Sequence, residues 1–167
     1  GAETPHLFHN EGHGQFRDVS AQVGKSFALP KVARGCAYGD FDNDGDLDVL
    51  ITTNNGPAFL YRNDGVTNHG IRFHVTGTRS NRDGIGTNIR IWTPEGMRWL
   101  TVKSGSSYLS HSQRDVTFGL AEATRVERAQ LEWPSGKTQE LGPLNADCTY
   151  DVDEDKGVTG STPFRRT

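Results

Sequence analysis

Apolar and polar residues alternate along much of this chain, and this alternation limits the possible folds more than any other feature. Single polar residues separate Ile71, Phe73 and Val75, and the same pattern recurs at residues 116–120 and 129–133. A period of two places apolar side chains on one face of a β-strand, so each strand is expected to have one buried and one solvated face. Turn sequences containing glycine lie between the strands. The pattern therefore predicts an all-β chain.

The first segment, residues 1–67, contains two similar stretches of sequence. Leu7–Gly12 resembles Leu60–Gly65, and the two stretches lie roughly 50 residues apart, close to the length of one propeller blade. One blade cannot bury its own faces. We therefore expect this segment to be one blade of a partial propeller, whose partners are the remaining blades or another chain at the open edge.

Residues 68–155 contain a second run of seven or eight short candidate strands, enough for a small β-sandwich. The remaining residues, 156–167, are rich in glycine, threonine and serine and end near Arg165-Arg166. This composition predicts a flexible tail.

The negative charge of the chain is concentrated in one short segment. Its net charge is −3, with 21 acidic against 18 basic residues, and five of the acids fall between Asp40 and Asp48. No basic stripe with interleaved aromatic residues is present, which argues against nucleic acid as a partner. No apolar run is long enough to span a bilayer. The two cysteines, Cys36 and Cys148, lack metal-ligand spacing and are expected to be separate buried thiols rather than a disulfide.

The five clustered aspartates alternate with other residues. Counted from Asp40, carboxylates occupy positions 1, 3, 5 and 9, and glycine occupies position 6. Calcium requires six to eight oxygen ligands in flexible geometry, and glycine permits the sharp turn of such a loop. At position 7, Asp46 is expected to bind through its carbonyl oxygen. The spacing predicts a calcium site at these residues: Asp40, Asp42, Asp44, Asp46 and Asp48.

An EF-hand is the obvious alternative for this loop, and the sequence excludes it. An EF-hand ends on a bidentate glutamate at position 12, which here is Ile51. The flanking stretches, 34–38 and 49–52, read as strands rather than helices. The motif contains no histidine or candidate nucleophile, so we expect the ion to hold the loop in shape rather than to catalyse a reaction.

Two known families share these motifs. Residues 34–51, together with residues 10–20, resemble the FG-GAP/VCBS repeat of integrin-like β-propellers. Four later blocks, in order, resemble the ASPIC/UnbV domain: Asn81–Gly86, Gly105–Ser110, Phe118–Leu120 and Trp133–Gly136. The resemblance implies a secreted or cell-surface protein, whether extracellular or periplasmic, and calcium at the same five aspartates. Relatives in these families carry several complete calcium loops, whereas this chain has one.

Three functional hypotheses follow. The first is a non-catalytic calcium-binding extracellular module for adhesion or ligand binding, whose partner is an extracellular protein or a glycan. The second is a carbohydrate-binding module that uses an exposed tryptophan; Trp92 is out of phase with its apolar neighbours and is the preferred candidate over Trp99 and Trp133. The third is an accessory part of a secreted enzyme, with Ser110, His111 and Asp115 close in sequence but no nucleophile-elbow motif.

Overall fold

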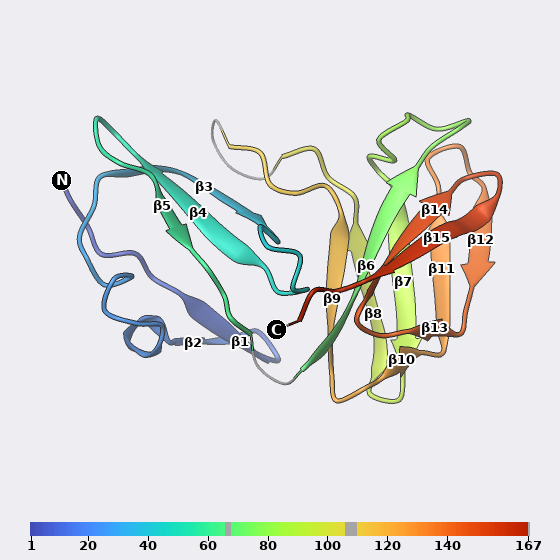
Figure 1. Ribbon diagram of the computed structural model, residues 1–167, viewed down its shortest axis with the longest axis horizontal. Coiled ribbons are helices and arrows are strands. Elements are labelled where there is room, and N and C mark those ends of the chain that lie inside the picture. Colours follow the sequence, from blue (N-terminus) through green and yellow to red (C-terminus); the bar gives the residue numbers. More distant parts are fainter. Residues whose placement is uncertain (66–67, 106–109, 167) are drawn as a thin grey trace.

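The computed structural model describes residues 1–65, 68–105 and 110–166. Two lobes lie side by side (Figure 1): a repeat segment, residues 1–65, and a sandwich, residues 68–166. Nearly all regular structure is β-strand, and the described residues contain one short 3₁₀ helix, Ser20–Gln22. The predicted all-β class is confirmed. No helix among these residues has the length and apolar character needed to cross a bilayer.

The repeat segment consists of a hairpin and a small sheet. Strands β1 (Phe8–Gly12) and β2 (Gln15–Asp18) form the hairpin. Strands β3 (Ala33–Gly39), β4 (Asp48–Thr53) and β5 (Phe59–Tyr61) form an antiparallel sheet in the order β3-β4-β5. This sheet has three of the four strands typical of a propeller blade.

The sandwich is formed by two four-stranded sheets. One has the order β12-β11-β7-β8 and the other β15-β14-β6-β9, and a short β10-β13 pair lies beside them. The strands are β6 (His69–Thr76), β7 (Asn88–Thr93), β8 (Gly96–Thr101), β9 (Val116–Ala121), β10 (Arg125–Val126), β11 (Arg128–Glu132), β12 (Thr138–Leu141), β13 (Leu144–Asn145), β14 (Cys148–Asp153) and β15 (Gly157–Pro163). Neighbours pair antiparallel except β14 and β6, which are parallel.

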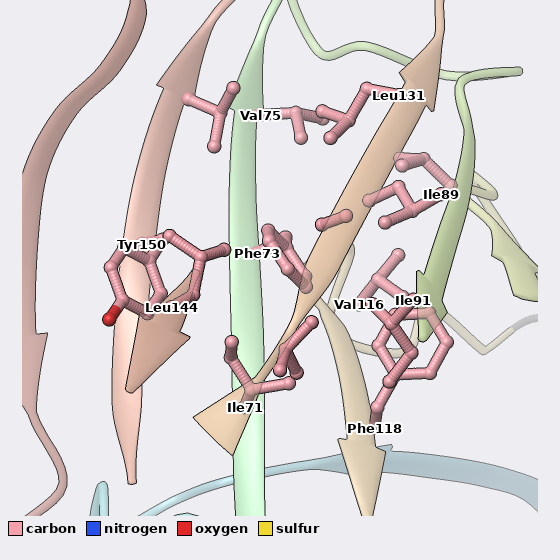
Figure 2. Packing of buried hydrophobic residues seen from close by; sticks show 14 of the residues in the cluster. Ile71, Phe73, Val75, Ile89, Ile91, Val116, Phe118, Leu131, Leu144 and Tyr150 are labelled. Atoms are coloured by element: carbon pink, nitrogen blue, oxygen red, sulfur yellow. The ribbon is translucent and has the colours of Figure 1, made fainter. Parts of the chain in front are cut away.

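The hydrophobic core lies between the two sheets of the sandwich. Its buried cluster runs from Ile71 on β6 to Val152 on β14, and Phe73 packs edge-on against Phe118 at its centre (Figure 2). The alternating residues of 71–75, 116–120 and 129–133 all point into this cluster, as the period predicts. The repeat segment contributes no residue to it.

Two sequence-based expectations are wrong. The tail was expected to be flexible, but Gly157–Pro163 forms β15, which pairs with β14 along its whole length. Its polar residues are those of an exposed edge strand, which composition alone does not distinguish from a loop. The cysteines are two free thiols, as expected, but neither is fully buried: Cys148 is half-buried, and Cys36 is exposed because the face of β3 that carries it is uncovered.

Candidate metal centre

The aspartate-rich residues 40–48, called here the metal loop, join β3 to β4. The expected strands on either side are confirmed, and Gly39 pairs with Asp48 at the base of the loop. Within the loop, Asn43 and Gly45 have φ angles of 61° and 101°. These left-handed residues reverse the chain, which returns the two ends of the loop to each other.

Three of the five predicted ligands come together. Asp40, Asp42 and Asp48 each offer a carboxylate oxygen, and these oxygens all lie within 4.8 Å of one another. Asp40 and Asp48 are buried, with 9% and 2% of their surface exposed. The other two predicted ligands lie outside this group: Asp44 accepts a hydrogen bond from the backbone N–H of Asp46 at 2.9 Å, and the Asp46 carboxylate lies against Gly65.

Backbone hydrogen bonds fix the two buried carboxylates. Asp40 accepts from the N–H groups of Asp44 and Gly45, at 3.1 and 2.9 Å. Asp48 accepts from Phe41 at 2.7 Å and from Asn63 at 2.8 Å. A carboxylate has about four acceptor positions, so these bonds orient the oxygens and leave capacity for an ion.

The loop carries more negative charge than its neighbours neutralise. Burial raises the pKa of Asp44, with a further contribution from Asp42, and burial together with Asp44 raises the pKa of Asp46. One guanidinium, that of Arg72, lies 2.6 Å from Asp40. The positive charge of Arg166 acts on Asp46 in the opposite direction. The five carboxylates still outnumber these two cations, and such a donor set suits a hard divalent cation.

The metal loop opens onto a cleft of ≈ 330 Å³. Asp40 and Asp48 line it on one side, and Leu60, His111 and Gln113 line the other parts. The cleft gives an ion from solvent a route to the carboxylates, which a metal site requires.

The tryptophans considered for carbohydrate binding differ in exposure from the expectation. Trp99 on β8 is the exposed tryptophan, with 61% of its surface accessible, whereas Arg128 covers the ring of Trp92 at 4.3 Å and Trp133 is buried in the core. The preference for Trp92 was therefore wrong, because the alternation of β7 does not reveal a cross-strand arginine.

The residues of the enzyme hypothesis do not form a triad among the described residues. Asp115 contacts His74, at 2.8 Å, rather than completing a triad with His111. Part of the Gly105–Ser110 block, residues 106–109, lies outside the described residues.

Four residues that hold the metal loop or the sandwich turns were not singled out by sequence reasoning: Arg72, Gln113 and Phe164 at the metal loop, and Glu154 at the turns of the sandwich. Arg72 alternates with apolar residues on β6 and was expected to face solvent, but it is 2% exposed because the metal loop covers that face. The others act over long sequence separations, for which a single sequence offers no local signal.

Comparison with known families agrees with this division into two parts. Residues 1–51 match the model of the FG-GAP-like repeat, and residues 77–159 match that of ASPIC and UnbV. The chain carries an FG-GAP-like repeat followed by an ASPIC and UnbV domain. The repeat segment thus contains the FG-GAP-like repeat, and the sandwich contains the ASPIC and UnbV domain.

Three curated relatives share the name cartilage acidic protein 1. The proteins from Mus musculus and Homo sapiens are each 42% identical to this chain over 55 residues, which are 33% of the chain and 8% of the relative. The Xenopus tropicalis protein is 36% identical over 75 residues, which are 44% of the chain and 11% of the relative. The matched region is thus about a tenth of the length of these relatives.

Glu154 links two turns within the part of the chain that matches the ASPIC and UnbV model. Its carboxylate is fully buried and accepts backbone N–H bonds from residues 78–80, each at 2.8 Å. The hydroxyls of Ser80 and Ser135 donate to its other oxygen. Burial alone would raise the pKa of Glu154, but these hydrogen bonds, that of Ser135 first, outweigh it and hold the pKa well below its usual value. One carboxylate thus joins the turn before Asn81 to the Pro134-Ser135-Gly136 turn.

Proposed function

We propose that this chain is a non-catalytic, calcium-binding extracellular module in which the ion holds the metal loop in shape for adhesion or ligand binding. The observation that carries the proposal is the convergence of Asp40, Asp42 and Asp48 within 4.8 Å, two of them buried. Carboxylates held this close repel one another unless a cation lies between them. The names of the relatives and the two matched families are compatible with a secreted protein, and we extend that location to this chain.

The donor set favours calcium over other ions. All candidate ligands are oxygens, with no histidine or cysteine in the group. Several carboxylates on a glycine-containing loop suit the large, flexible coordination shell of calcium, whereas magnesium prefers fewer carboxylates and more water. Asp44, Asp46 and the loop carbonyls are the remaining residues of the predicted site and would complete the shell.

The test is calcium titration of the full chain by calorimetry and thermal unfolding. Extracellular modules bind calcium with dissociation constants of about 10⁻⁴ to 10⁻³ M, so 10 mM CaCl₂ is expected to stabilise the fold by about 1–3 kcal/mol. Asp42→Asn removes this stabilisation, and Asp64→Asn is the control because Asp64 is exposed and pairs with Arg62 outside the metal loop. A chain that neither binds calcium nor changes its melting temperature in 10 mM CaCl₂ contradicts the proposal.

A second candidate function, carbohydrate binding, is favoured by a cleft of ≈ 550 Å³ between the two lobes. Tyr38 and Trp99 line it together with the polar residues Thr101, Lys103 and Gln113. Aromatic rings beside hydrogen-bonding side chains are the usual surroundings of a bound sugar. A glycan array probed with wild-type chain and with Trp99→Ala tests this function. Binding lost in the variant supports it, and an array without any bound glycan removes it.

A further inference from the structure

We propose that the metal loop is also the joint between the two lobes, so that calcium binding and docking of the sandwich stabilise each other. The proposal rests on the calcium site proposed above and extends it to the sandwich. Three separate segments of the sandwich contact the metal loop or the strand before it, through an ion pair and hydrogen bonds: β6, residues 112–113 and residues 164–165. Figure 1 shows the C-terminal end of the chain returning to the side of the sandwich that faces the repeat segment.

The first contact is a buried ion pair. Nη2 of Arg72 lies 2.6 Å from Oδ2 of Asp40, and the two side chains are 2% and 0% exposed. Nε of Arg72 donates to the hydroxyl of Thr117, which lies directly opposite on β9. A buried guanidinium requires a counter-charge. Asp40 supplies that charge, so the sandwich can bury Arg72 only when the metal loop is in place.

The second contact holds the start of the metal loop. The side-chain oxygen of Gln113 accepts from the N–H of Asp40 at 2.8 Å, and the N–H of Gln113 donates to the carbonyl of Tyr38 at 2.9 Å. The hydroxyl of Ser112 accepts from the N–H of Tyr38 at 3.2 Å. The sandwich thereby fixes the backbone on the N-terminal side of the first candidate ligand.

The third contact covers the turn of the metal loop. The N–H of Arg165 donates to the carbonyl of Asn43 at 2.6 Å. The ring of Phe164 lies 5.1 Å from the guanidinium of Arg72 and so close to Gly45 that a Cβ atom there would collide with it. Glycine at this position therefore serves the packing of Phe164 as well as the turn.

Calcium binding and docking of the sandwich are coupled because both use the side chain of Asp40. Asp40 belongs to the group that would hold calcium, and it is also the partner of Arg72. An ion that orders Asp40 lowers the conformational cost of docking the sandwich, and docking lowers the cost of binding the ion by the same factor. The positive charge of Arg72 opposes the ion, but it neutralises one of five carboxylates and leaves the loop strongly acidic.

Hydrogen exchange measured by mass spectrometry, on the full chain with 10 mM CaCl₂ or with EDTA, tests the coupling. In the wild type, calcium is expected to slow exchange both in residues 40–51 and in residues 112–117 and 164–165. In Arg72→Gln, protection is expected to remain in residues 40–51 and to be lost in the two sandwich segments. Calcium affinity, measured by calorimetry, is expected to fall about fivefold, at the low end of known couplings between sites.

The matched control is Arg90→Gln. Arg90 lies on β7 of the sandwich and pairs with Gln130 and Glu132 rather than with the metal loop. This variant is expected to keep the wild-type exchange pattern and calcium affinity. If Arg72→Gln does not fold, Phe164→Leu replaces it, since Phe164 is a half-buried residue directly after the end of β15. That variant is expected to lose calcium protection at residues 164–165.

The outcomes separate the two proposals. Wild-type chain in which calcium protects residues 40–51 but not the sandwich segments overturns the coupling and leaves the calcium site standing. Unchanged calcium affinity and protection in Arg72→Gln also overturns the coupling. Wild-type chain in which calcium protects no segment overturns both.

Discussion

The sandwich and the repeat segment are built from similar short strands, yet among the described residues only the sandwich encloses an extended hydrophobic core. Ile71, Phe73 and their neighbours are fully buried between its sheets, whereas the repeat segment leaves Phe8, Phe16 and Leu29 more than half exposed. The repeat segment is held at its metal loop by charge and hydrogen bonds instead. The comparison indicates that apolar burial stabilises the sandwich, whereas the repeat segment buries few apolar residues, Phe27 and Ile51 among them, and depends more on polar contacts, as expected for a blade without its neighbours.

Deleting one aromatic side chain from each region should produce the largest contrast. Phe73 packs edge-on against Phe118 in the core, so Phe73→Ala is expected to lower the free energy of unfolding by about 3–5 kcal/mol. Phe8→Ala removes a ring that is 57% exposed, so its effect should stay within about 0.5 kcal/mol. Urea unfolding followed by tryptophan fluorescence measures both. Equal losses in the two variants would show that the repeat segment is not held mainly by polar contacts.

The sandwich also contains the buried carboxylate of Glu154, and its removal should cause the next largest loss of stability. Glu154→Gln replaces a buried acceptor of five hydrogen bonds by an amide that can accept with one oxygen only, and about 3 kcal/mol of stability is expected to be lost. The control is Glu95→Gln, which alters an exposed pair with Arg98 and should change the unfolding midpoint little.

The same carboxylate predicts how stability depends on pH. The pKa of Glu154 is lowered in the folded chain, whereas the unfolded value is close to 4.5. Its contribution is therefore complete above pH 4.5 and declines as the pH falls below it, because the unfolded chain then binds the proton more readily. Acid titration of the unfolding midpoint should show a shallower decline in Glu154→Gln than in wild type. Parallel curves would mean that other carboxylates dominate acid unfolding.

The sequence could predict what depends on local pattern and spacing. The period of two located the core strands, and the aspartates around Gly45 marked the loop between β3 and β4. Pairings between distant residues could not be predicted, because nothing near Arg72 marks Asp40 as its partner. Phe164 was missed for the same reason, since its segment was read by composition as a tail.

Substitution of Gly45 tests the contact between the metal loop and the sandwich and should have a smaller effect on stability. Gly45→Ala must hold alanine at a φ of 101° and displace Phe164, and about 2 kcal/mol of destabilisation is expected. Gly136 is the matched control, since its φ is 87° but nothing lies near its missing side chain, so Gly136→Ala is expected to cost only about 1 kcal/mol. Added to Phe164→Ala, Gly45→Ala should cost only as much stability as Gly136→Ala does, because the ring that it would displace is already absent. If the cost of Gly45→Ala is the same with and without the ring, the contact of Phe164 with Gly45 contributes nothing at this position.

The two cysteines report the same contrast without changing stability. Cys36 lies exposed on β3, while burial, with a smaller contribution from Asp147, raises the pKa of Cys148. Because the thiolate is the reactive form, Cys36 should react with a thiol reagent at pH 8 much faster than Cys148. Cys36→Ser should abolish the fast phase, and urea should convert the slow phase to a fast one. Equal rates in the folded chain would mean that β14 opens as readily as β3, and that the sandwich is not the more firmly packed of the two lobes.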